Sequence, residues 1–183
     1  TKMLQMPEPQ SLPLRVNMGS RCFFTDDSAH VWQPEQAYTQ GSWGYVGGEA
    51  LTKKTKYGQV PAADVDILGT DQDPLYQTAR VGVEMFRADV PAGQYRVVLH
   101  FAELESREKE QMSVYNLGNE AIDTDFRGRE MVVRVQDLPG DTINLTRQYG
   151  RYRAVELHYT VETQDGIVIR FESLTGETLL NGI

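Results

Sequence analysis

Two aromatic side chains in a glycine-rich run are the first residues whose types could recognise a ligand. Trp43 and Tyr45 stand in the run Gly41-Ser42-Trp43-Gly44-Tyr45, where the backbone can present them to solvent. An aromatic face suits the C–H side of a pyranose ring, and nearby planar polar groups suit its hydroxyls. The run therefore predicts either a carbohydrate contact or a loop that these two side chains pin onto the rest of the fold.

The sequence offers no pair or triad of side chains suited to catalysis. Glu103 and Glu105 would lie about 7 Å apart on one face of a strand, which falls within the roughly 6.5–9.5 Å of an inverting glycosidase pair. Carboxylates side by side on one strand, however, do not flank a bond from opposite sides. His100 and His158 fall inside predicted strands, where structural histidines are usual. We therefore predict no catalytic residues. No cluster of His, Asp or Glu has the spacing of metal ligands, so we predict no metal site and no cofactor.

Composition and charge set the class of protein. The chain has 183 residues, 40% hydrophobic and 24% charged, which is enough for one globular domain with a sizeable core. Its net charge of -8 disfavours nucleic acid and anionic membrane surfaces as partners. No apolar run is long enough to span a bilayer. The single cysteine, Cys22, excludes an internal disulfide, and its neighbours Phe23 and Phe24 predict a buried thiol.

Apolar alternation in the second half of the chain is typical of strands with one buried face. The predicted strands are 14–18, 21–24, 81–90, 95–102, 112–115, 121–122, 131–135, 143–145, 155–161, 167–171 and 179–183. Residues 25–63 show no convincing periodicity and predict a long loop. Residues 70–80 predict a turn at Asp73-Pro74, followed by Arg80, whose planar guanidinium can tie a loop to carboxylates or carbonyls.

These elements predict an all-β fold in which two antiparallel sheets pack face to face as a jelly-roll sandwich. There is no βαβ rhythm and no clear amphipathic helix. We expect residues 1–13 to be a linker or tail from a preceding domain and residues 14–183 to form the sandwich, with the final strand cut short. The missing initiator Met indicates a piece of a longer protein.

Four motifs resemble those of malectin domains, a family of carbohydrate-binding modules. They are Arg15-Val16-Asn17-Met18-Gly19, Asp73-Pro74-Leu75-Tyr76-Gln77-Thr78-Ala79-Arg80, Gly93-Gln94-Tyr95-Arg96-Val97-Val98-Leu99-His100-Phe101-Ala102-Glu103 and Leu180-Asn181-Gly182-Ile183, in family order. The segment from Trp32 to Tyr45 looks more particularly like modules near the C-terminus of bacterial glycoside hydrolases of the β-galactosidase kind.

The resemblance implies a sugar site on loops at one end of the sandwich. Glu105 and Arg107 sit where the family's site lies and could bond hydroxyls; the alternative is a solvated charged turn over 103–110. An earlier family tyrosine corresponds to Tyr57 or Tyr45. Val81, Glu105 and Ser106 replace family aromatics, so the animal lectin's specificity does not carry over.

The expected function is a non-catalytic module that holds oligosaccharide or polysaccharide near the catalytic domain of the same chain. The resemblance implies a secreted, periplasmic or cell-surface location. The alternative is a structural module that packs against the catalytic domain and binds no sugar. A second candidate surface, for sugar or for a neighbouring domain, carries Tyr149 and Tyr152 among Arg147, Arg151 and Arg153.

Overall fold

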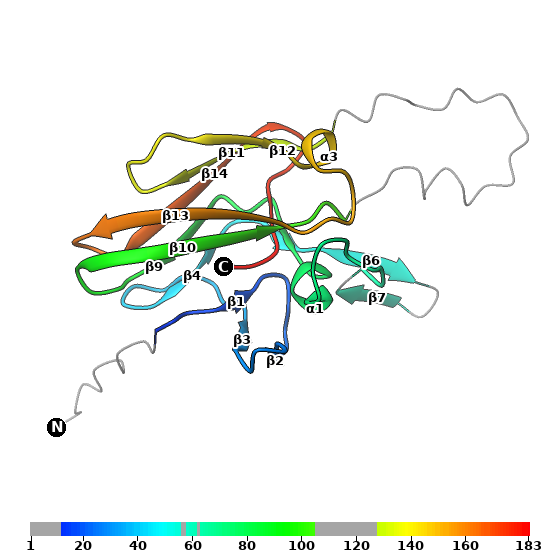
Figure 1. The fold of residues 1–183 in the computed structure, drawn as a ribbon, viewed down its shortest axis with the longest axis horizontal. Helices are drawn as coiled ribbons and strands as arrows, with labels where there is room; N and C mark the ends of the chain where they lie inside the picture. Colours follow the sequence, from blue (N-terminus) through cyan, green and yellow to red (C-terminus); the bar gives the residue numbers. More distant parts are fainter. Residues whose placement is uncertain (1–11, 56–57, 62, 105–127) are drawn as a thin grey trace, which may run out of the picture.

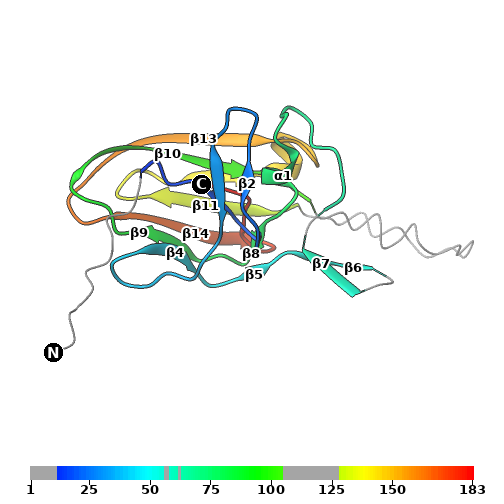
Figure 2. The same cartoon turned by 90° about the horizontal axis from the view of Figure 1, so that it is seen from below.

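The predicted all-β sandwich is confirmed by the computed structural model, which describes residues 12–55, 58–61, 63–104 and 128–183. Two layers of strands face each other, and the two short helices lie at one end (Figures 1 and 2). Neither of these helices has the length or apolar character needed to cross a bilayer, within the described part of the chain.

One layer is a five-stranded sheet in the order β12-β11-β14-β9-β4. Its strands are β4 (Trp43–Val46), β9 (Met85–Ala88), β11 (Glu130–Val135), β12 (Asp141–Asn144) and β14 (Ile167–Thr175). All of its neighbours pair antiparallel. The predicted alternation over 167–171 places every second side chain in the buried core, whereas over 131–135 Val132 is buried together with Met131, Val133 and Val135.

The other layer is built on a long antiparallel pair, β10 (Gly93–Phe101) with β13 (Val155–Thr163). Beside it lie β1 (Val16–Asn17), β3 (Val31–Pro34) and β2 (Phe24–Thr25), with β1 and β3 parallel. Gly182 joins the two groups because it bridges both Asn17 and His100. Val16 and Ile183 also exchange two backbone hydrogen bonds, of 2.8 and 3.1 Å. The two ends of the described chain therefore lie side by side.

Short elements close the end of the sandwich. Strand β8 (Arg80–Val81) lies between β15 (Leu179–Leu180) and β5 (Glu49–Ala50), and β6 (Thr52–Thr55) pairs with β7 (Gly58–Pro61). Helices α1 (Asp73–Tyr76) and α3 (Leu145–Gln148) have one turn each. Asn144 caps α3 by accepting a hydrogen bond from the backbone N–H of Arg147.

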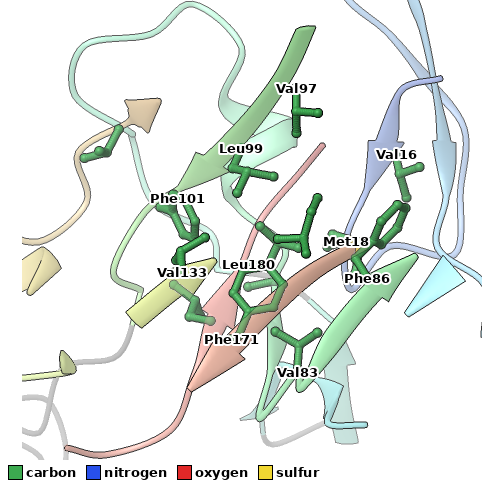
Figure 3. Packing of buried hydrophobic residues seen from close by; sticks show 14 of the residues in the cluster. Val16, Met18, Val83, Phe86, Val97, Leu99, Phe101, Val133, Phe171 and Leu180 are labelled. Carbon is green, nitrogen blue, oxygen red and sulfur yellow. The ribbon is translucent and has the colours of Figure 1, made fainter. Parts of the chain in front are cut away.

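The core fills the space between the layers (Figure 3). Side chains that are at most 6% exposed come from both layers and from the connecting segments: Val16, Met18, Val83, Phe86, Val97, Leu99, Phe101, Val133, Phe171 and Leu180. This burial is the main favourable contribution to folding, at about 25 cal/mol per Å² of apolar surface.

Sequence reasoning was wrong about three local features. Residues 25–63 are not one loop but contain strands β3 to β7, each only two to four residues long. Leu145 begins the helical turn α3 rather than continuing a strand. Cys22 is exposed, because the chain between Gly19 and β2 runs along the surface and leaves Phe23 68% exposed as well.

Asn181 is a fully buried polar residue that connects three segments. Its side-chain oxygen accepts from the backbone N–H of Ala102 at 2.7 Å, and its amide donates to the carbonyls of Tyr76 and Thr78 at 2.9 and 2.8 Å. The side-chain oxygen and both amide N–H groups are thus hydrogen-bonded. The C-terminal segment is thereby fixed to β10 and to the turn after α1.

We expect Asn181→Ala to lower the free energy of unfolding by about 3 kcal/mol or more, because it leaves three buried backbone groups without partners. Urea unfolding measures the loss. Gln94→Ala, an exposed polar substitution on β10, serves as the control and should change stability by less than about 0.5 kcal/mol. Equal effects of the two substitutions would contradict the role assigned to Asn181.

His100 is a satisfied structural histidine, as its position inside a strand predicts. It is 7% exposed, its Nδ1 lies 2.9 Å from the hydroxyl of Tyr76, and its ring meets Trp32 edge-on at 5.3 Å. Burial lowers the pKa of His100 to about 4, against the opposing charge of Glu156 and with a small further lowering from His158. The imidazole is therefore neutral at neutral pH.

The depressed pKa of His100 predicts a pH dependence of stability. An unfolded histidine takes up a proton near pH 6.5, whereas the folded imidazole does so only near pH 4. The free energy of unfolding should therefore fall as the pH drops from about 6.5 to about 4, by at most about 3 kcal/mol. His100→Gln should flatten this part of the profile in urea unfolding. An identical slope in the variant would contradict the assignment.

Candidate functional site

The two predicted aromatics, Trp43 and Tyr45, share one face of strand β4 because they are two residues apart. Trp43 is 7% exposed and stacks on Phe86, with ring centroids 6.2 Å apart. Its indole belongs to the core, so it holds β4 on the sandwich. Tyr45, two residues further along the strand, is only partly buried.

Arg80 covers one face of the Tyr45 ring, with its guanidinium carbon 3.3 Å from the ring centroid. The same guanidinium binds both carboxylate oxygens of Glu35 at 2.9 Å and donates to the carbonyls of Gly47 and Gly48 at 3.1 and 2.6 Å. The predicted role of Arg80, tying a loop to a carboxylate and to carbonyls, is confirmed. Glu35 also accepts from the backbone N–H of Gly19 at 2.8 Å.

These groups form the floor of a surface hollow of about 540 Å³. Its lining comes from the segment after β1, the approach to β4, and strands β5 and β8: Ser20, Arg21, Glu35, Tyr45, Gly48, Glu49, Ala50 and Arg80. We call this the Tyr45 hollow. Side chains in it offer hydroxyl, carboxylate and guanidinium groups, which are the groups that recognise polar ligands.

Arg21 and Glu49 are the free charges of the Tyr45 hollow. Both are exposed, and neither makes an ion pair or a side-chain hydrogen bond within the described part of the chain. The other two charges, Arg80 and Glu35, compensate each other in a buried bidentate pair. The four charges of the lining sum to zero.

Three of the predicted site residues, Tyr57, Glu105 and Arg107, lie outside the described residues, so their prediction stays untested. Sequence reasoning missed Ser20, Arg21, Glu35 and Glu49. Glu35 is 45 residues from Arg80, and no local pattern announces such a pairing. Arg80 was the one sequence feature that pointed to a partner such as Glu35, because a guanidinium that ties down a loop needs a carboxylate somewhere in the fold.

The second candidate surface lies around α3 and the start of β13. Tyr149 is 41% exposed, while Tyr152 packs partly against the core. The guanidiniums of Arg147 and Arg153 are exposed. Among the residues that the structure describes, no group of three or more His, Cys, Asp or Glu side chains could hold a metal ion at this surface or elsewhere.

Residues 12–183 match the family described as the malectin domain. The chain belongs to the malectin domain family. Malectin domains are a carbohydrate-binding fold and not a catalytic one. No curated protein matches this chain.

Solved structures with the same fold include an enzyme and plant receptors. The β-glucuronidase 2 of Bacteroides uniformis, solved covalently bound to cyclophellitol-6-carboxylate aziridine, is 31% identical, with a TM-score of 0.72 over 92% of this malectin domain and 17% of that chain. The ectodomain of ANX1 from Arabidopsis thaliana is 13% identical, with a TM-score of 0.58; the match covers 92% of this malectin domain and 46% of the ANX1 chain. The plant receptor-like kinase FER is 17% identical, with a TM-score of 0.60; the match covers 93% of this malectin domain and 47% of the FER chain. The malectin domain thus spans less than a fifth of the enzyme and about half of each receptor chain.

We expect Arg80→Lys to destabilise this malectin domain by about 2–4 kcal/mol, because an ammonium cannot satisfy the buried Glu35 and two carbonyls together. Urea unfolding measures the difference. Arg87→Lys is the matched control: Arg87 binds Asp89 at the surface, with 27% of its side chain exposed, and should cost less than about 1 kcal/mol. A loss at Arg80 no larger than at Arg87 would contradict the anchoring role.

Proposed function

We propose that this malectin domain is a non-catalytic carbohydrate-binding accessory module of a larger glycoside hydrolase. It would hold oligosaccharide or polysaccharide near a separate catalytic domain of the same chain. Such an arrangement raises the effective concentration of substrate at the catalytic site, so that weak intrinsic binding is sufficient. The observation that carries the proposal is a polar, charge-balanced hollow beside Tyr45 on a carbohydrate-binding fold.

The kind of parent enzyme is supported by the 31% identity to the Bacteroides β-glucuronidase, in which the matching region is 17% of the chain. The sequence motifs favour a β-galactosidase-like parent, and both are enzymes of β-linked glycosides. A secreted, periplasmic or cell-surface location follows from this proposal, since extended glycans are met outside the cytoplasm.

The Tyr45 hollow would bind a sugar through its free charges. The Glu49 carboxylate can accept from two adjacent hydroxyls, and the Arg21 guanidinium can donate to hydroxyl or ring oxygens. Tyr45 contributes a ring edge and a hydroxyl, since Arg80 lies over one face of the ring. The buried Arg80–Glu35 pair would keep this constellation in shape before the sugar arrives.

The alternative is a structural module that packs against the catalytic domain and binds no sugar. Two observations favour it: Trp43 belongs to the core, and one face of Tyr45 is taken by Arg80. Both side chains would then serve mainly to fix the segment between β3 and β5. The two functions are separated by whether the isolated domain binds glycan.

A calorimetric screen of the domain against β-galactosides and related oligosaccharides tests the proposal. We expect millimolar to micromolar binding, weakened at least about tenfold by Glu49→Ala and by Arg21→Ala, because each removes charge-assisted hydrogen bonds. Glu162→Ala and Arg170→Ala, exposed substitutions of the same types on β13 and β14, are the matched controls and should bind normally.

Two results would count against this function. Binding that survives both hollow substitutions would move the site elsewhere on the domain. A folded wild-type domain that binds no sugar at millimolar concentration would favour the structural alternative, and the catalytic domain would then be the partner to test.

A further inference from the structure

Phe23 is the most exposed of the large hydrophobic side chains in the described part of the chain, at 68%. The next residue, Phe24, is not exposed in this way but packs against the core. Phe24 turns inward and stacks on Trp32, with ring centroids 6.2 Å apart and planes 15° from parallel. Phe23 directly precedes β2 at the base of the β2–β3 hairpin, which projects at the lower edge of Figure 1.

The segment that carries Phe23 is held at both ends. On one side, the N–H of Gly19 donates to Glu35 in the floor of the Tyr45 hollow, and the Ser20 hydroxyl makes two bonds with the backbone of Cys22. On the other side, Phe24 pairs with Trp32, whose indole N–H donates to the buried Asp26 at 3.0 Å. An aromatic ring on such a fixed segment loses little freedom when a ligand covers it.

Phe23 is also close to the Tyr45 hollow along the chain. Ser20 and Arg21 line the hollow, and two residues span at most about 7 Å of backbone. The hollow supplies hydrogen-bonding groups, yet Arg80 covers one face of Tyr45, the one aromatic residue of its lining. The exposed Phe23, two residues along the chain from Arg21, can add an aromatic face for the apolar side of a pyranose.

We propose that Phe23 is the platform for a second sugar unit, so that the domain binds a neutral oligosaccharide that extends from the Tyr45 hollow across the Phe23 ring. This inference rests on the proposed function and deepens it: the ligand is a chain of neutral pyranoses rather than a single sugar. The neutral character follows from the balanced charges of the hollow, and the chain length follows from the position of Phe23 outside it.

A protein partner is the competing occupant of this face. Val31, 56% exposed, pairs with Thr25, which is two residues from Phe23 along the chain. A stable protein interface buries about 800 Å² on each partner around an apolar core. Phe23 and Val31 alone fall far short of that area, whereas one isolated aromatic beside a polar hollow matches what a sugar chain requires.

The test compares ligand lengths. Galactose and β-1,4-galactotetraose, and glucose and cellotetraose, are titrated calorimetrically into the wild-type domain and into Phe23→Ala, Phe23→Trp and Val31→Ala. In the series that binds, we expect the wild-type tetrasaccharide to bind more tightly than the monosaccharide. Phe23→Ala should lower that ratio by a factor of about 3 to 10 and leave monosaccharide affinity unchanged. Phe23→Trp should restore the ratio, and Val31→Ala should not alter it.

The outcomes separate the two proposals. Absence of binding to every sugar would overturn the carbohydrate-binding function itself, and this inference with it. Binding in the hollow with the same length ratio in wild type and Phe23→Ala would overturn only the role of Phe23. Self-association of the domain in sedimentation, abolished by Phe23→Ala with the length ratio unchanged, would likewise overturn it and assign the face to a protein partner. Because Phe23 is largely exposed, its substitutions should leave the fold intact, which thermal unfolding checks.

Discussion

The ion pair between Arg80 and Glu35 is the interaction on which the candidate site depends. It joins strand β8 to the segment that leads into β4, and through two glycine carbonyls it also fixes the turn between β4 and β5. Burying two charges is costly, and the cost is offset only when geometry is good and the remaining hydrogen-bonding groups are satisfied. Here the fork of Arg80 meets four acceptor contacts, and Glu35 also accepts from Gly19. One buried guanidinium therefore determines where Ser20, Tyr45 and Glu49 stand relative to each other.

Trp43 and Tyr45 differ in burial although they are neighbours on one strand. Both occupy the same face of a short strand, so both would be buried if the opposite layer covered the strand evenly. Trp43 meets Phe86 and is enclosed. Tyr45 instead carries the Arg80 guanidinium over one face of its ring and lines the hollow. The two neighbouring aromatics therefore differ in their contact, which is apolar for Trp43 and cation–π for Tyr45.

Sequence patterns predicted the long strands and missed the short ones for a physical reason. Alternation over nine residues, as in β10 and β13, exceeds what chance gives, and those strands were found. Strands of two to four residues, such as β2 to β5, hold at most two side chains on each face and carry no readable period. Their positions come from contacts distant in sequence, among them the pairing of β4 with β9. The same holds for the site: Tyr45 and Arg80 could be chosen from local features, but Glu35 could not. Cys22 shows the opposite failure, since its neighbours Phe23 and Phe24 predict a buried thiol and the residue lies exposed.

The side-by-side position of residues 16 and 183 has a mechanical consequence. Tension applied to these two points would act across the hydrogen bonds between them and load those bonds one after another, beginning with the pair that Val16 and Ile183 exchange. The long β10–β13 ladder would carry none of that load at first, because neither of its strands lies between the two points and the applied force. The fold would therefore open locally under a pull between these points, whereas thermal unfolding must disrupt the whole core at once.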